Sequence, residues 1–236
     1  MEDLAQSAYD MLGMRLSEWQ LRAFNTYAEE LATWNARVNL TAITEPKAIE
    51  MRHFLDALTC LLVISPAPGL RIIDVGTGAG FPGLPLKIAY PDLSVTLLEA
   101  TAKKVTFLEH LVERLGLEGV TLVNARAEEV GQRAEHRETY DWVLARAVAE
   151  MRVLAEYVLP LCRLGGHCLA QKGEDAHQEV AVAQKAIDLL GGRVDQLTPV
   201  ELPTVAETRY LVDIAKVAAT PPAYPRRPGR PAKRPL

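Results

Sequence analysis

One segment limits the fold of this chain more than any other. The apolar stretch Arg71–Val75 runs directly into a glycine-rich turn, Gly76–Gly83, and then into the helical pattern Leu84–Ala89. Glycines at a strand-to-helix turn let the backbone approach a nucleotide-sized ligand that a Cβ would exclude. In open α/β sheets, ligands bind beside the carboxyl ends of the strands. The segment therefore predicts an α/β fold with a binding site after its first strand.

Short apolar runs with the length of strands alternate with helical stretches along the rest of the chain. These runs are Leu70–Val75, Ser94–Leu98, Val120–Val123, Trp142–Ala145 and Gly166–Gln171. Such alternation predicts βαβ units and a mostly parallel, twisted sheet with right-handed crossovers. The last run, Tyr210–Val217, follows the segment 193–202 with no room for a crossover helix. We therefore predict that this final pair is an antiparallel hairpin.

The N-terminal region has helical patterning. Ser17–Gln20 has the spacing of a capping box, and apolar residues recur after it at helical intervals. A second helix is expected to begin near Pro46 and to end before the breaker Ser65–Gly69. We expect three parts: an N-terminal helical cap (residues 1–68), a ligand-binding core (69–220) and a basic, proline-rich tail (221–236).

Charge is unevenly divided between the tail and the rest of the chain. The net charge is −4, but five cations between Arg226 and Arg234 give the tail +5, which leaves −9 on the remainder. Six prolines from Pro221 onward prevent a packed core there, so we expect the tail to be extended or disordered when free. A basic arm on an acidic body favours RNA as its partner over a merely solubilising role.

Composition argues against several classes of protein. No run of 18 or more apolar residues occurs, and the acidic N-terminus lacks the pattern of an export signal, so we expect a cytosolic protein without a membrane partner. Cys60, Cys162 and Cys168 show neither paired spacing nor a histidine at zinc-ligand spacing. We expect no disulfide and no metal site, and we interpret the cysteines as small core residues.

Two acidic residues indicate what the glycine turn binds. Glu99 ends the second strand, 23 residues past Gly76, where a carboxylate can accept hydrogen bonds from both ribose hydroxyls of an adenosine. The spacing G-x-G-x-G differs from the dinucleotide pattern, and Asp74 suits a cofactor with a cationic amino-acid end better than a pyrophosphate. These features favour an adenosine-containing cofactor with a cationic amino-acid end, while a nicotinamide cofactor stays possible on the pattern alone.

From Trp34 to its C-terminus the chain resembles the ribosomal RNA small-subunit methyltransferase G family. The motifs that carry the resemblance, in order, are Asn39–Thr41, Arg52–Asp56, Asp74–Gly83, Lys103–Lys104, Arg126–Glu128, Arg146–Ala147, Lys172–Gly173 and Tyr224–Gly229. The resemblance implies a Rossmann-like class I methyltransferase with an N-terminal helical cap. It also implies methyl transfer from S-adenosylmethionine, with S-adenosylhomocysteine as product, to N7 of one guanosine in the decoding-centre loop of 16S rRNA.

The resemblance also implies a set of cofactor contacts. Added to the turn glycine Gly78, these are Gly76, Phe81, Glu99, Ala100, Thr101, Ala127, Glu128 and Arg146. One departure is Glu150–Met151, where the family usually has proline or serine after an alanine. This difference concerns the geometry of one loop rather than the activity.

The acceptor side is expected to lack a catalytic dyad, because guanine N7 carries a lone pair and no proton. Positioning groups are needed instead. Arg146 ends the fourth strand, Lys172 ends the fifth, and Arg209 opens the antiparallel last strand at the same edge, so three cations are predicted to converge there. We place these three and His53 in the catalytic set, although His53 fits a structural role equally well.

Other interpretations of the sequence also stay open. Lys103 and Lys104 begin a helix, where positive charge opposes the helix dipole and a phosphate partner would explain it. The acceptor could also be a tRNA or a small metabolite, or the chain could be a non-catalytic regulator that binds nucleotide and RNA. We expect a monomer that binds 16S rRNA or the small subunit, and no DNA.

Overall fold

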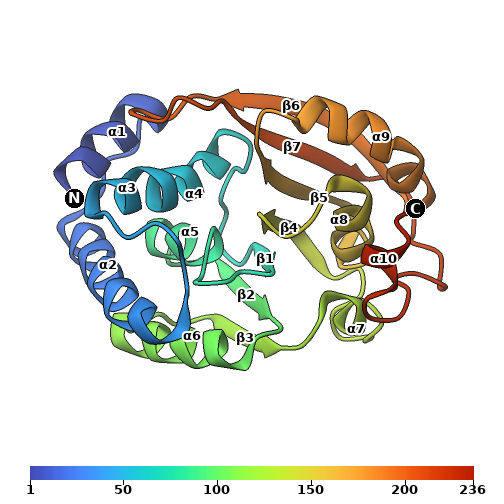
Figure 1. Cartoon of the computed structure of the whole chain (residues 1–236), viewed down its shortest axis with the longest axis horizontal. Helices are drawn as coiled ribbons and strands as arrows, with labels where there is room; N and C mark the ends of the chain where they lie inside the picture. The colour runs from blue at the N-terminus through green and yellow to red at the C-terminus, as the bar shows by residue number, and fades with distance from the viewer.

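The computed structural model describes residues 1–236 and contains one seven-stranded sheet with the order β3-β2-β1-β4-β5-β7-β6 (Figure 1). The strands are β1 (Arg71–Val75), β2 (Ser94–Glu99), β3 (Val120–Asn124), β4 (Tyr140–Arg146), β5 (Cys162–Lys172), β6 (Gly192–Val200) and β7 (Arg209–Lys216). The first five pair in parallel. Strand β7 is antiparallel to both β5 and β6, which confirms the predicted hairpin. The predicted fold class is therefore confirmed.

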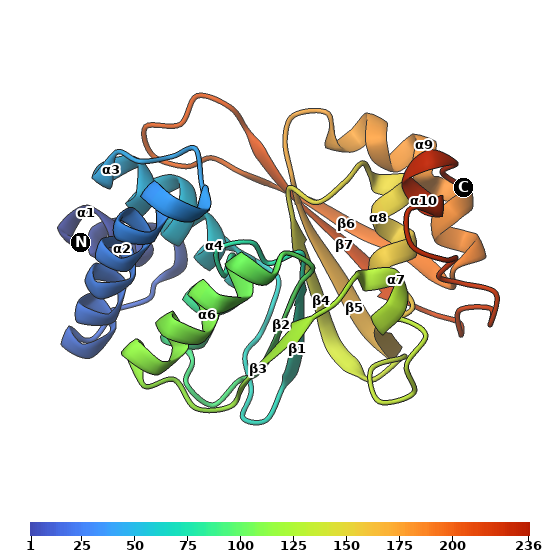
Figure 2. The same cartoon turned by 60° about the horizontal axis from the view of Figure 1, so that its bottom comes forward.

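Helices cover both faces of the sheet. On one face lie α5 (Gly83–Ala89) and α6 (Ala102–Leu115), which contribute buried residues to the same core cluster. On the other lie α7 (Ala127–Val130), α8 (Met151–Val158) and α9 (Ala176–Leu189), and Figure 2 shows these three opposite α6. Neighbouring residues of β1 alternate between the two resulting cores: Ile72 belongs to one buried cluster and Ile73 to the other. Burial on both faces explains why the central strands are almost continuously apolar.

The N-terminal cap consists of α1 (Glu2–Leu12), α2 (Glu18–Val38), α3 (Pro46–Ile49) and α4 (Asp56–Leu58). The capping box at Ser17 is present, with both reciprocal hydrogen bonds to Gln20. A π-helical turn, Glu50–Leu55, joins α3 to α4, and a 3-10 turn, Thr59–Leu62, follows α4. The pattern of apolar residues in the sequence did not predict α1. The cap packs on the side of the sheet that carries α5 and α6 (Figure 2).

The C-terminal segment 221–236, here called the strap, is ordered, so the prediction of an extended or disordered tail is wrong. The Arg226 guanidinium forms an ion pair at 2.6 Å with Glu156, whose side chain is fully buried in α8. The Gly229 N–H donates to Glu128 of α7 (2.9 Å), and Pro231 at the start of the short helix α10 (Arg230–Lys233) is buried. The prediction from composition was wrong because buried carboxylates of the core hold the strap, which therefore needs no core of its own apolar residues.

Two further observations concern composition. Cys60, Cys162 and Cys168 are all free thiols in the interior, which agrees with their interpretation as core residues. No helix has both the length and the apolar character needed to cross a membrane.

Candidate active site

The glycine-rich turn after β1 has a backbone conformation that requires glycine, and the N-terminal cap holds it. Gly76, Gly78 and Gly80 have φ angles of 65°, 62° and 102°, which side-chain-bearing residues rarely adopt. Tyr27, fully buried on α2, donates its hydroxyl to the Ala79 carbonyl at 2.5 Å. A Cβ on Gly80 would lie 2.5 Å from that hydroxyl oxygen. The turn therefore needs glycine here because the cap approaches it so closely.

Asp74 stabilises the turn from inside. Its side chain is fully buried, and one carboxylate oxygen accepts the Thr77 hydroxyl (2.6 Å) and the Gly83 N–H (2.8 Å), while the other has no partner. Burial raises the pKa of Asp74 to about 7, a shift that these hydrogen bonds and the Arg146 cation only partly oppose. Asp74 therefore stabilises the turn, and its suitability for a cofactor with a cationic amino-acid end stays a prediction.

A cavity of about 240 Å³ opens beside the turn, at the carboxyl ends of β1, β2 and β3. We call it the turn cavity. Its walls are mainly apolar, with two acids among them: Val75, Gly76, Leu98, Glu99, Ala100, Ala125, Arg126, Ala127, Glu128, Val148 and Tyr157. Five of the predicted cofactor contacts are in this set. Arg126, Val148 and Tyr157 had not been predicted, because each becomes part of the wall only through the fold.

Glu99 is the central polar group of the turn cavity. Its carboxylate accepts the Gly78 N–H at 3.1 Å and the Thr101 N–H at 2.7 Å, so both of these predicted residues contact Glu99 although they do not line the cavity. A carboxylate has about four acceptor sites. Two therefore stay free for donors that enter the cavity, such as a pair of vicinal hydroxyls.

Phe81 and Arg146 lie outside the turn cavity, in a stack that links the cap to the core. The Phe81 ring lies between Tyr27 (centroids 5.1 Å apart) and His53 (4.6 Å). The guanidinium carbon of Arg146 is 4.8 Å from the Phe81 centroid. Arg146 is further held by an ion pair with Asp56 at 2.8 Å. The stack fixes the arginine in one orientation.

His53 is kept neutral in this stack. Burial, and then the neighbouring Arg146 cation, lowers its pKa from 6.5 to about 3. Its Nδ1 lies 3.3 Å from an Arg146 Nη and can only accept there, which leaves Nε2 to donate to the Thr41 hydroxyl at 2.8 Å. His53 therefore acts on Arg146 as a positioning residue.

A second cavity, of about 400 Å³, lies at the carboxyl ends of β4 and β5. We call it the basic mouth. All four residues predicted for the catalytic set line it, together with several others: Ile43, Arg52, His53, Asp56, Arg146, Ala147, Gln171, Lys172, Gly173, Glu179 and Arg209. Four cations and two acids leave a formal charge of +2. The fold thus brings Arg146, Lys172 and Arg209 together, as the strand order predicts.

Acidic partners, which sequence reasoning missed, neutralise part of the basic mouth. Asp56 pairs with Arg146, and Glu179 lies 2.6 Å from the Lys172 ammonium. Arg209 has no ion pair, and its Nε is buried without a hydrogen-bond partner. In the sequence, only the motif Arg52–Asp56 indicated a role for Asp56, because an acidic residue one helical turn after a histidine can lie on the same helix face.

The loop after β4 divides the two cavities. Ala147 has a φ of 55° and lines the basic mouth, whereas Val148 lines the turn cavity. Val148 packs so closely on Gly76 that a Cβ there would lie 2.9 Å from it. The two cavities are therefore neighbours that share one thin wall.

Comparison with known proteins shows which family has this arrangement. The family described as rRNA small subunit methyltransferase G matches residues 20–207. The chain belongs to this family. A ribosomal RNA small subunit methyltransferase G of Roseiflexus castenholzii is 56% identical over 95% of each chain. One of Desulforamulus reducens is 46% identical over 99% of this chain and 97% of its own.

Solved methyltransferases share the fold at low sequence identity. A methyltransferase in complex with a Haloferax volcanii activator has a TM-score of 0.59 and 14% identity, over 80% of this chain and 98% of its own. A SAM-dependent methyltransferase of Aquifex aeolicus has a TM-score of 0.54 and 16% identity, over 72% and 93%. This methyltransferase G family member therefore has the fold of class I methyltransferases.

Proposed function

We propose that the chain transfers a methyl group from S-adenosylmethionine to N7 of a guanosine in the decoding-centre loop of 16S rRNA. The observation that supports this most directly is the pair of neighbouring cavities. One is mainly apolar with a buried carboxylate, and the other is basic. The names of the relatives, which specify small-subunit rRNA, support the same substrate.

The turn cavity fits the adenosine part of this cofactor. Glu99 has spare acceptor capacity for the two ribose hydroxyls, and the apolar side chains around it, among them Leu98 and Ala127, suit the faces of an adenine. Gly76 and Gly78 would border the ribose and the methionine part. When bound, S-adenosylmethionine supplies an electrophilic methyl group on a sulfonium.

The basic mouth suits the acceptor nucleotide. Guanine N7 needs no general base, so the side chains have to hold the base and its phosphate at near-attack distance. Arg146, fixed by Asp56 and His53, can donate to guanine O6 or to a phosphate oxygen. Arg209 lines the same cavity and takes part in no ion pair, so its guanidinium can serve the same purpose. His53 is not suited to act as a base, because its unprotonated nitrogen faces Arg146.

The experiment that tests this function is mass mapping of methylated nucleosides. Wild-type protein, 16S rRNA or small subunits, and S-adenosylmethionine with a labelled methyl group should yield one 7-methylguanosine in the decoding-centre loop. Arg146→Ala should lower turnover by about 10²-fold, the usual cost of a lost transition-state donor. A labelled methyl group found in tRNA or in a small metabolite, and not in 16S rRNA, would show that the proposed substrate is wrong. Undiminished methylation by Arg146→Ala would remove the role of this residue.

The proposed substrate also has consequences for partners and location. An enzyme of 16S rRNA works in the cytoplasm and needs neither DNA nor a membrane. The monomeric state and the division of the chain at residues 68 and 220 stay predictions. Light scattering of the purified chain, alone and with RNA, tests whether it is a monomer.

A further inference from the structure

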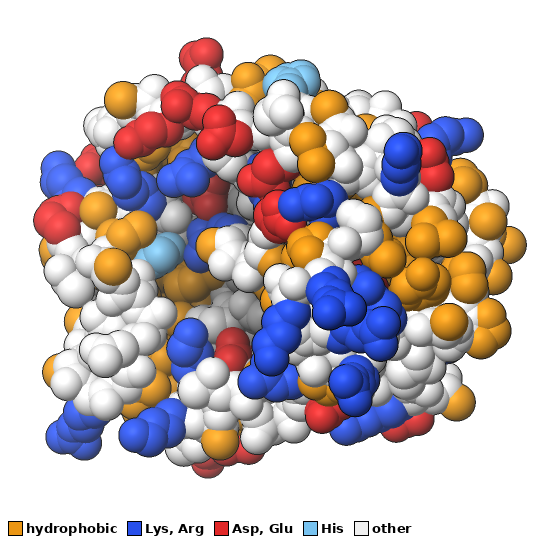
Figure 3. Space-filling model, turned by 45° about the vertical axis from the view of Figure 1, so that its right-hand side comes forward, with side chains coloured by type: hydrophobic (Ala, Val, Ile, Leu, Met, Phe, Trp, Pro, Cys, Tyr) orange, Lys and Arg blue, Asp and Glu red, His pale blue; other side chains and the backbone are white.

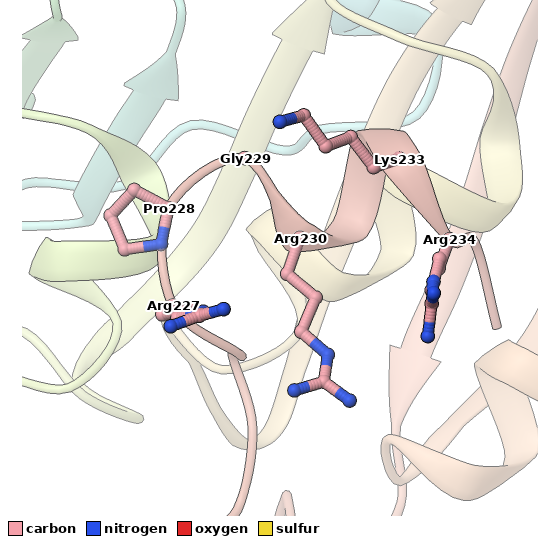
Figure 4. A pocket seen from close by; sticks show the side chains of 6 residues that line it. All are labelled: Arg227, Pro228, Gly229, Arg230, Lys233 and Arg234. Carbon is pink, nitrogen blue, oxygen red and sulfur yellow. The ribbon is translucent and has the colours of Figure 1, made fainter.

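The strap carries four cations that its own structure does not use. Of its five basic side chains, Arg226 is committed to the buried Glu156. The other four, Arg227, Arg230, Lys233 and Arg234, are exposed and take part in no ion pair. We call these four the strap patch. Figure 4 shows their side chains projecting from α10 and from the turn that precedes it.

The strap patch differs from the basic mouth in its charge balance. It surrounds a depression of about 560 Å³ whose remaining lining residues are Pro228 and Gly229, with no acid among them. In the mouth, by contrast, two carboxylates offset four cations. Figure 3 shows Lys and Arg side chains gathered densely on the face of the molecule that includes α10. Unopposed cations on an otherwise acidic protein form a surface for a polyanion.

The backbone beneath these cations is fixed before any ligand binds. The Glu156 carboxylate accepts from both the backbone N–H and the guanidinium of Arg226, at 2.6–2.9 Å in its three shortest contacts. The Gly229 N–H is held by Glu128, and Pro231 is buried. A disordered arm would lose conformational entropy on binding, whereas this strap has already been ordered by folding.

The strap patch adjoins the turn cavity rather than the basic mouth. Glu128 joins the patch to this cavity, because it lines the cavity and accepts the Gly229 N–H. The patch and the mouth share no lining residue. A ligand that touches both must therefore bridge two separate surfaces. A folded RNA with a continuous phosphate backbone meets this requirement.

We propose that the strap patch binds backbone phosphates of the rRNA at a second position, separate from the mouth that holds the target base. This inference rests on the proposed function, which supplies the RNA. The contacts would be independent of RNA sequence and sensitive to salt, because they release counterions from the phosphates. The patch would thus orient the rRNA, while the mouth selects the nucleotide.

The test compares two double variants by their binding to 16S rRNA over a range of salt concentrations. Arg230→Gln with Lys233→Gln removes two cations of the strap patch. Arg15→Gln with Lys185→Gln removes two exposed cations that lie outside both the patch and the mouth. For the patch variant, the slope of log affinity against log salt should become shallower by about 0.7–0.9 per lost contact. The control should keep the wild-type slope.

Three outcomes would overturn the proposal: an unchanged slope for the patch variant, the same loss for the control, or no salt-dependent binding by the wild type. Thermal unfolding and S-adenosylmethionine affinity of both variants should match the wild type, which shows that the fold and the turn cavity are intact. The experiment measures binding of RNA and not its methylation. A wild type that binds 16S rRNA through the patch without methylating it would therefore refute the proposed function alone.

Discussion

The Arg146 guanidinium illustrates how much a single side chain here depends on its neighbours. It is held by the Asp56 carboxylate, the unprotonated nitrogen of His53 and the face of Phe81. Each partner restricts a different degree of freedom of the guanidinium plane. An arginine held in this way loses little further entropy when it binds a base or a phosphate.

The neutral state of His53 gives the protein a predictable response to acid. Its pKa of about 3 in the folded state lies below the ordinary 6.5, so the folded state binds fewer protons than the unfolded state between these values. The stability that His53 contributes is present above pH 6.5 and is lost as the pH falls toward 3. In His53→Gln, the free energy of unfolding should therefore fall less steeply over this range.

Urea unfolding at a series of pH values measures this slope. His177→Gln, which replaces an exposed histidine outside both cavities, is the matched control and should follow the wild-type curve. Parallel curves for wild type and His53→Gln would contradict this prediction, because they would show that the pKa of His53 is the same in the folded and unfolded states.

Glu99 carries the clearest prediction for the cofactor. Replacing it with Gln leaves one carbonyl oxygen, so only one of the Gly78 and Thr101 N–H groups keeps its acceptor, and the charge that strengthens hydrogen bonds from ribose hydroxyls is removed. Since a charged hydrogen bond contributes about 1.5–3 kcal/mol, affinity for S-adenosylmethionine should fall by roughly tenfold or more in calorimetry. Glu113→Gln, on the exposed side of α6, should leave the affinity unchanged. Equal affinities for both variants would remove Glu99 from the site.

At the scale of elements, the glycine turn and α2 constrain each other. Gly80→Ala would force a Cβ against the Tyr27 hydroxyl, in addition to the strain of its positive φ. Gly69 also has a positive φ, of 77°, but open space around it, so Gly69→Ala isolates the backbone strain. Gly80→Ala should cost about 1–3 kcal/mol more than Gly69→Ala in urea unfolding, because only the former overpacks. Equal costs would mean that α2 does not hold the turn.

The elements also show where sequence reasoning succeeds and where it stops. Strands β1 to β5 and the β6–β7 hairpin were predictable because apolar runs and connection lengths are local signals. The predicted order and direction of these strands alone placed Arg146, Lys172 and Arg209 at one edge of the sheet. Long-range pairs were not predictable: Asp56 with Arg146 and Tyr27 with Ala79 join residues of the cap to the core. The strap was misjudged for the same reason, since its partners lie 70 or more residues away.

At the scale of the whole molecule, a buried carboxylate fastens the C-terminus to the core. Arg226→Gln would leave Glu156 buried and without a cationic partner, which should cost about 3–5 kcal/mol of stability and lower the melting temperature. Adding Glu156→Gln should recover part of this loss, because the uncompensated charge is then removed. The exposed neighbour Arg227→Gln is the control, with an expected effect within about 0.5 kcal/mol. A loss for Arg226→Gln no larger than that of the control would show that the strap is not fastened there.

The cap, the core and the strap therefore depend on one another, although the sequence suggests three successive parts. The cap supplies Asp56 and His53 to the basic mouth and Tyr27 to the glycine turn. The strap supplies the N–H that binds Glu128 at the wall of the turn cavity.

The wall formed by Ala147 and Val148 has a consequence for the order of events in catalysis. Each cavity has exposed lining residues of its own, Arg126 on one side and Gly173 on the other. Neither ligand has to pass the other to enter or leave. On the proposed placement of the two ligands, a short RNA that reaches only the basic mouth would leave the turn cavity open, so steady-state kinetics with such an RNA should follow a random rather than an obligatory sequence of binding.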